Sequence, residues 1–131
     1  MTKERQVQIA ALSGALAVGL GAFGAHGLKS ILEQNQTVDI WETAVFYHFI
    51  HTLVLLWLSN QSSLGAGPRC SFLLGMGIFS GTLYVLAVSG IRWLGAITPI
   101  GGVSLIVGWL WLFGAHFVKT GQAKAALRDG D

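Results

Sequence analysis

The stretch VFYHFIHTLVLLWL, residues 45–58, places His48 and His51 inside a run of apolar side chains. Apart from these two imidazoles, the stretch carries no side chain that can be charged near neutral pH. With the residues before it, the apolar segment extends over 40–58, and about 20 such residues are enough for a helix to cross a bilayer core. The stretch therefore predicts a transmembrane helix with two histidines near the bilayer centre.

Three more segments of similar length and composition occupy 7–28, 70–90 and 97–118. Only 11% of the 131 residues are charged, whereas a soluble domain has about 25%. The connections between the segments, such as the expected loop at 29–39, are short, and short connections make neighbouring helices antiparallel. The sequence thus predicts an all-α integral membrane bundle of four antiparallel transmembrane helices that forms a single domain over 1–131.

The distribution of basic residues predicts the orientation of this bundle. With four crossings, both termini and the 59–69 connection share one side of the membrane. That side holds most of the basic residues, Lys3, Arg5, Arg69, Lys119, Lys124 and Arg128, and the other side holds only Lys29 and Arg92. Because basic residues favour the cytoplasmic side, we expect both termini in the cytoplasm. A cleaved secretory signal is the alternative for 7–28, although the apolar core of a signal is usually about 7 to 15 residues long.

Local motifs indicate where two of the helices begin. Asp39 followed by Glu42 resembles a capping box at the start of the second helix. Trp41, between them, suits the aromatic belt at a membrane interface. Thr98 and Pro99 offer an N-cap and a first helical residue for the fourth helix.

Small residues recur at every fourth position on three of the predicted helices. Helices in lipid gain little from hydrophobic association, so close packing of small residues has to supply much of their attraction. The repeats are Ser13, Ala17, Gly21 and Ala25; Ser71 and Gly75; Gly77 and Gly81; and Ser104 and Gly108. Two interpretations are open: the repeats pack the helices of one bundle together, or one of them is a self-association surface.

The two central histidines belong to a predicted polar seam. Ionisable residues inside a membrane span are costly and are candidates for function. His48 and His51 are three residues apart and lie near one face of their helix. The helical rise, counted inward from the predicted ends, puts Tyr84 at about the depth of His48 and Ser80 at about the depth of His51. These four residues and Tyr47 make up the seam.

Three interpretations of the seam are open. Its imidazoles are neutral and structural, or they pass protons or a small polar solute, or they bind a metal ion or haem. A tetrahedral metal site normally needs three or four protein ligands, and His26 and His116 lie near opposite membrane surfaces. We therefore expect no metal and no cofactor. No Ser, His and acid set lies at one depth, and a net charge of +2 is too small to indicate nucleic-acid binding.

Four motifs, one for each predicted span, carry a resemblance to a known family: GAFGAHGL at 21–28, WETAVFYHFIH at 41–51, FSGTLY at 79–84 and ITPIGG at 97–102. In this order they resemble the small membrane proteins of domain-of-unknown-function family 423, which include the bacterial inner membrane protein YgdD and the eukaryotic transmembrane protein 256. The positions that carry the resemblance are Gly24, Ala25, His26, Trp41, Thr43, Tyr47, His51, Ser80, Gly81, Leu83, Tyr84, Thr98, Pro99, Gly101 and Gly102. The resemblance implies four spans and no established biochemical activity.

The expected function is non-enzymatic. We expect a small protein of the bacterial inner membrane that acts through helix packing with lipid, with copies of itself or with another membrane protein. The alternative is a proton-linked or small-solute conduit along the predicted seam. His48 is less characteristic of the family than His51, which weakens any mechanism that needs both imidazoles.

Overall fold

The structure, a computed structural model, describes the backbone of residues 1–128 and the side chains of 1–61 and 63–115. Within this part the chain forms α1 (Lys3–Ala25), α2 (Lys29–Asn35), α3 (Val38–Leu58), η1 (Ser62–Leu64), α4 (Gly67–Ser89), η2 (Arg92–Ala96) and α5 (Thr98–Arg128). Four stretches of the described residues are long and apolar enough to cross a membrane: Lys3–Ala25, Val38–Leu58, Gly67–Ser89 and Arg92–Ala115. The predicted all-α membrane bundle is confirmed.

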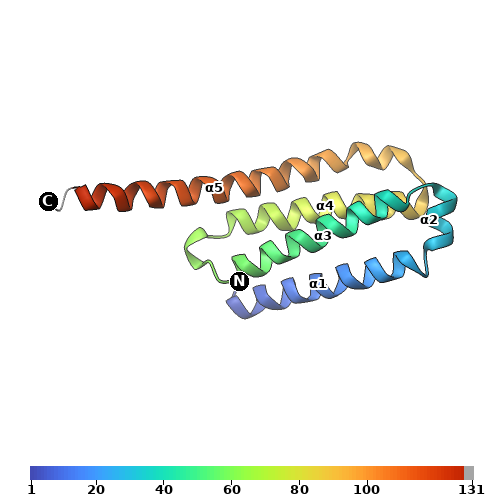
Figure 1. The fold of residues 1–131 in the computed structure, drawn as a ribbon, viewed down its shortest axis with the longest axis horizontal. Helices are drawn as coiled ribbons and strands as arrows, with labels where there is room; N and C mark the ends of the chain where they lie inside the picture. Colours follow the sequence, from blue (N-terminus) through green and yellow to red (C-terminus); the bar gives the residue numbers. More distant parts are fainter. Residues whose placement is uncertain (129–131) are drawn as a thin grey trace.

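The long helices pack in the order in which they follow along the chain. α1 packs against α3, α3 against α4, and α4 against α5. In Figure 1, α3 and α4 therefore lie in the middle, with α1 on one flank and α5 on the other. The short helices α2 and η2 lie together at the end of the bundle away from the N-terminus.

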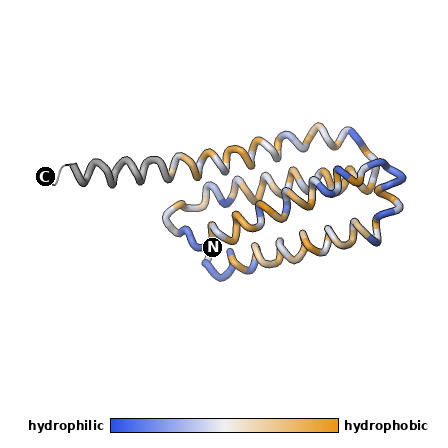
Figure 2. The backbone as a smooth tube through the Cα atoms, in the orientation of Figure 1, coloured by the Kyte–Doolittle hydropathy of each residue, from blue (hydrophilic) through white to orange (hydrophobic). Residues whose placement is uncertain are grey.

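The outside of the bundle is apolar along the length of its helices. Large apolar side chains such as Leu12, Leu74 and Val103 are more than half exposed. Hydrophilic residues gather instead at the two ends of the bundle, as Figure 2 shows for the part it colours. An apolar exterior with polar ends is the surface that a helix bundle needs in order to sit in lipid.

The connection at 29–39 was expected to be a loop, but it contains the helix α2. Leu32 of α2 is almost completely buried, which anchors the segment to the bundle. The segment also supplies donors to the C-terminal end of α4, whose last carbonyl groups have no partner within their own helix. Asn35 Nδ2 donates to the carbonyls of Ala87 and Val88 at 3.1 and 2.9 Å, and Thr37 Oγ1 donates to that of Ala87 at 2.7 Å. This segment therefore closes one end of the bundle.

The beginning of α3 differs from the expected capping box. The helix starts at Val38 with Thr37 as its N-cap residue, so Asp39 and Glu42 both lie inside the first turns. Trp41 is only 4% exposed and faces the bundle, whereas the sequence placed it in an interfacial belt. The spacing of Asp39 and Glu42 fits a capping box with Asp39 as the N-cap. The hydroxyl of Thr37 bonds to α4 instead, and the helix begins right after Thr37, at Val38.

The close approach of α4 and α5 depends on small residues from two of the predicted repeats. Ser104 Oγ donates to the carbonyl of Ser71 at 2.9 Å. A Cβ added to Gly75 would lie 2.8 Å from the backbone nitrogen of Leu105, and one added to Gly108 would lie 2.9 Å from the ring of Phe72. Backbone therefore meets backbone where these two helices cross, as expected for packing in lipid.

The small residues of α1 that face the bundle do not keep the predicted spacing of four along the whole helix. Ala17 is fully buried, and a Cβ on Gly21 would lie 3.3 Å from Val45 of α3. Ala25, the fourth member of the predicted repeat, is exposed, and Gly24 is buried in its place. The reason is geometric: with 3.6 residues per turn, a strict spacing of four drifts around the helix by about 40° at each step.

Gly77 and Gly81 of α4 do not pack against another helix of the bundle. A Cβ added to either residue would meet nothing within 4 Å among the neighbours that the structure describes. Among the described residues, Gly77 therefore makes no close helix contact of the kind expected from the repeat.

Candidate functional site

The single predicted seam is divided between two groups of side chains around α3. His48 faces α1 and α4, whereas His51 faces α4 and α5. Residues three apart on a helix differ by about 60° in direction, which is enough for each to meet different neighbours when a helix lies in the middle of a bundle. We call the groups the His48 cluster (Ser13, His48, Thr52, Met76 and Tyr84) and the His51 cluster (Tyr47, His51, Phe72, Phe79 and Trp109).

The His48 cluster is a chain of hydrogen bonds across three helices. His48 Nδ1 lies 3.2 Å from the hydroxyl of Tyr84 on α4, and Nε2 lies 3.1 Å from Ser13 Oγ on α1. Ser13 Oγ lies 2.7 Å from Thr52 Oγ1. The sulfur of Met76 accepts from Thr52 at 3.7 Å and from Ser13 at 3.9 Å. The structure thus places His48 beside Tyr84, at the depth that the sequence suggested.

One arrangement of protons gives every donor in the His48 cluster an acceptor. The hydroxyl of Tyr84 donates to His48 Nδ1, and His48 Nε2–H donates to Ser13. Ser13 donates to Thr52, and Thr52 donates to the sulfur of Met76. A thioether accepts a hydrogen bond but has no proton to pass on. The chain of bonds therefore ends inside the bundle, as in a network that links helices.

The His51 cluster combines two hydrogen bonds with ring packing. His51 is 5% exposed; its Nδ1 lies 2.7 Å from the carbonyl of Tyr47, and its Nε2 lies 3.3 Å from Nε1 of Trp109 on α5. The Tyr47 ring stacks on the imidazole at 5.8 Å between centroids and packs on Phe79 at 4.4 Å. Phe72 lies 5.7 Å from the imidazole. These rings enclose the imidazole between three helices.

The partners of His51 define its tautomer. A carbonyl can only accept, so Nδ1 carries the proton that is donated to Tyr47. The indole of Trp109 can only donate, so Nε2 offers its lone pair. A second proton on the ring would set two donors against each other at Trp109. Both nitrogens of His51 are therefore engaged in bonds that require the neutral imidazole.

Ser80 is not a partner of His51, although the sequence paired them by depth. The Ser80 side chain is 2% exposed, and its hydroxyl has no hydrogen-bond partner among the residues that the structure describes. His51 is turned toward α5 and makes its bonds to Tyr47 and Trp109 instead.

We expect Ser80→Ala to leave the free energy of unfolding unchanged or to raise it by up to about 1 kcal/mol, because the substitution removes an unpaired buried hydroxyl. Ser13→Ala is the matched control. It deletes a hydroxyl that bonds to His48 and Thr52 and should cost about 1 kcal/mol. Thermal unfolding of both variants in the same detergent measures the difference. Equal losses in the two variants would show that the Ser80 hydroxyl has a partner.

Five members of the clusters were not among the candidate residues: Thr52, Phe72, Met76, Phe79 and Trp109. Thr52 was detectable, since it lies four residues after His48 and so shares its face. Met76 and Trp109 gave no such signal. Their positions depend on how α4 and α5 cross α3, and one sequence does not define these crossings.

Trp41 and Gly24 form a close contact between α3 and α1. Trp41 Nε1 donates to the carbonyl of Leu20 at 3.1 Å, and its ring lies 4.8 Å from that of Tyr84. A Cβ on Gly24 would run into Nε1 and Cδ1 of the indole. The bare backbone of Gly24 is therefore what admits the ring.

The remaining motif residues make contacts at the ends of helices. His26 Nδ1 lies 2.9 Å from the carbonyl of Ala22, and Thr43 Oγ1 donates to that of Asp39 at 2.8 Å; both side chains are exposed. Thr98, the first residue of α5, is 8% exposed, and its hydroxyl lies 2.9 Å from that of Thr82 on α4.

Two glycines and a proline follow Thr98 in the same motif. Pro99 is exposed. Gly101 is buried against the backbone of Phe79, and a Cβ on Gly102 would lie 3.7 Å from the Phe79 ring. This motif therefore serves the contact between α5 and α4.

No group of three or more His, Cys, Asp or Glu residues in the described part of the chain is placed to hold a metal ion. The side chain of His116 lies outside the described residues. Where the structure is described, His48 and His51 bind other groups of the bundle, and the buried hydroxyl of Ser80 has no partner.

The comparisons with known proteins agree with the predicted family resemblance. A family model described as "Protein of unknown function (DUF423)" matches residues 20–102. The UPF0382 membrane protein YwdK of Bacillus subtilis is 43% identical over 110 residues, which cover 79% of this chain and 89% of that protein. A UPF0382 membrane protein of Staphylococcus saprophyticus is 48% identical over 109 residues, covering 79% of this chain and 89% of the relative.

A UPF0382 membrane protein of Schizosaccharomyces pombe is 39% identical over 108 residues, 77% of this chain and 92% of the relative. No solved structure matches the chain significantly. Four helices able to span a membrane and these matches lead to one conclusion: the chain belongs to the DUF423 family of membrane proteins, a family of unknown function.

Proposed function

We propose that this protein is a non-enzymatic component of the membrane, which acts by presenting its apolar helix faces to lipid, to copies of itself or to another membrane protein. One observation carries the proposal: both ring nitrogens of His48 and both of His51 are hydrogen-bonded within the bundle. These imidazoles were the leading candidates for chemistry. Their bonds instead tie α1, α3, α4 and α5 together.

The geometry of both clusters is unfavourable for proton relay. A relay needs groups that accept a proton on one side and release one on the other. The chain of bonds around His48 ends at the sulfur of Met76, and His51 lies between a carbonyl that only accepts and an indole that only donates. This arrangement supports a structural role for the histidines.

The proposed location is the bacterial inner (plasma) membrane, with both termini in the cytoplasm. Its support is the segregation of charge: Lys3 and Arg5 lie at the start of the first span, and Arg69 lines a small pocket with Met1 and Gln6 at the same end of the bundle. The opposite end carries Lys29 and Arg92. The excess of basic residues on the side of the termini favours the cytoplasm for that side.

The proposal is tested by replacing His51 with glutamine and with leucine in protein reconstituted into liposomes. Glutamine can donate to the Tyr47 carbonyl and accept from Trp109, whereas leucine can do neither. We expect His51→Gln to stay within about 0.5 kcal/mol of the wild type. His51→Leu should lose about 1 to 2 kcal/mol, because the Trp109 donor is left unpaired in the bundle.

The same liposomes report on transport. Dissipation of an imposed pH gradient should be equal in empty liposomes and in liposomes with wild-type protein or either variant. An intrinsic proton leak that both substitutions abolish would overturn the proposal in favour of a conduit, whatever the stabilities.

A further inference from the structure

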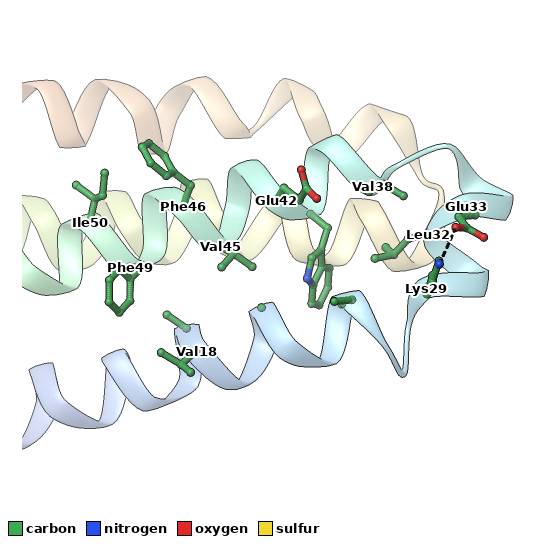
Figure 3. A pocket seen from close by; sticks show the side chains of 15 residues that line it. Val18, Lys29, Leu32, Glu33, Val38, Glu42, Val45, Phe46, Phe49 and Ile50 are labelled. Carbon is green, nitrogen blue, oxygen red and sulfur yellow. Dashed lines mark ion pairs between the residues drawn. The ribbon is translucent and has the colours of Figure 1, made fainter.

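An outward-facing groove lies between α1 and α3, and neither histidine cluster accounts for it. It has a volume of about 640 Å³, within the range of roughly 300 to 1,000 Å³ that is typical of small-molecule sites. In Figure 3, Val18 of α1 and Phe49 of α3 point toward each other across it. Besides Val18, the residues that α1 contributes to the lining are all small: Ala17, Gly21, Gly24 and Ala25.

The dimensions of the groove match one leaflet of a bilayer. It follows α3 from Val38 to Ile50, about 18 Å at a rise of about 1.5 Å per residue. The hydrocarbon core of a bilayer is about 30 Å thick, so a single leaflet contributes about half of that. The groove therefore runs from the membrane surface to about the bilayer centre, as one acyl chain does.

The two ends of the groove differ in polarity. The end nearer the bilayer centre is apolar and is lined by Val18, Phe49 and Ile50. Lys29, Glu33 and Glu42 line the end near α2, and Lys29 Nζ lies 3.9 Å from Glu33 Oε1. This charged end holds two carboxylates and one ammonium group. The two carboxylates therefore exceed the single ammonium group by one negative charge.

The geometry points to a phospholipid with a primary-ammonium headgroup, of the phosphatidylethanolamine type, as the occupant of this groove. One acyl chain lies between α1 and α3, the phosphate lies near Lys29, and the ammonium group binds Glu42. An anionic headgroup would meet two carboxylates. A second copy of the chain seated face to face would bring its own Glu33 and Glu42 to the same depth, and like charges repel.

This inference deepens the proposed function, since it names the lipid that one face of the protein engages. It is tested on delipidated protein titrated with three phospholipids of identical acyl chains, carrying ethanolamine, choline or glycerol headgroups, with native mass spectrometry as the readout. We expect the ethanolamine lipid to bind about fivefold more tightly than the choline lipid. Glu42→Gln should reduce this preference to less than about twofold.

A second substitution tests the groove itself. Val18 is 62% exposed, so Val18→Trp fills the groove without removing a core contact, and all three lipids should bind about tenfold more weakly. Val103→Trp is the matched control, because Val103 is 60% exposed on α5 and does not line the groove. It should leave lipid binding unchanged.

Three results would overturn the inference: equal binding of the ethanolamine and choline lipids, tightest binding of the glycerol lipid, or a Val18→Trp variant that changes its oligomeric mass but not its lipid binding. The inference and the proposed function fail separately. A protein that leaks protons but keeps the Glu42-dependent preference contradicts only the proposed function. A protein that does not leak and shows no preference contradicts only the inference.

Discussion

Gly101→Ala is expected to destabilise the protein by about 3 kcal/mol, the upper end of the usual range for overpacking. A Cβ at this position would run into the backbone nitrogen of Phe79 and would lie 2.9 Å from both Phe79 Cα and the carbonyl oxygen of Gly75. Side chains can rotate away from an added methyl group, but backbone atoms move only if α4 as a whole moves. The contact between α4 and α5 would therefore open.

Gly77→Ala is the matched control for this substitution. Gly77 is an exposed helical glycine of α4, and a Cβ there would meet nothing within 4 Å among the described residues. Alanine is favoured over glycine in a helix by up to about 1 kcal/mol, so this variant should be as stable as the wild type or more stable. Circular dichroism melting in one detergent compares the two. If Gly101→Ala melts no earlier than Gly77→Ala, the close crossing of α4 and α5 is wrong.

Gly24→Ala has the second largest expected effect, a loss of about 2 to 3 kcal/mol. Its Cβ would enter the indole of Trp41, a ring that is 4% exposed and has little room to rotate. If the ring moved, its hydrogen bond to the carbonyl of Leu20 would break, leaving a buried N–H unpaired. The contact between α1 and α3 would weaken at the end of the bundle near α2.

Two further variants isolate this contact. Gly19→Ala, on the same helix, adds a Cβ that meets nothing within 4 Å among the described residues and should cost nothing. Trp41→Phe removes part of the ring that the added methyl group strikes. The double variant Gly24→Ala/Trp41→Phe should therefore lose less stability than the sum of the two single losses. Strict additivity would mean that Gly24 and Trp41 do not touch.

The sequence predicted the four crossings because the pattern that indicates them lies in the order of residues along the chain. About 20 consecutive apolar residues and the charges between them are sufficient, and no knowledge of contacts is needed. The same arithmetic of helical rise brought His48 to the depth of Tyr84, and the two side chains are 3.2 Å apart. Depth along the membrane is thus well defined by a single sequence.

The direction in which a side chain points around its helix axis was much harder to predict. His51 shares a depth with Ser80 in the sequence estimate, but it faces Trp109, because the position of α5 relative to α3 does not follow from either segment alone. Trp41 has the composition of an interfacial residue. Its inward orientation depends on Gly24, which lies on another helix.

The helix α2 was missed for a related reason. It is too short for periodicity to indicate a helix, and its stability comes from the burial of Leu32 and from Asn35, which donates to the end of α4. Such tertiary contacts appear only when the bundle is assembled. Lys29 and Glu33, four residues apart, were the one local sign of a helix there.

The central claim is that each long helix crosses the membrane, so that the chain spans it four times. Single cysteines introduced into a Cys70→Ser background and labelled on intact spheroplasts with a membrane-impermeant maleimide test it most directly. The sites are Thr2, Gln34, Asn60 and Arg92, together with a cysteine added after Asp131. We expect Gln34→Cys and Arg92→Cys to react from outside, and the other three to react only after the membrane is permeabilised. If Asn60→Cys reacts from the same side as Gln34→Cys, α3 does not cross and the four-span bundle is wrong.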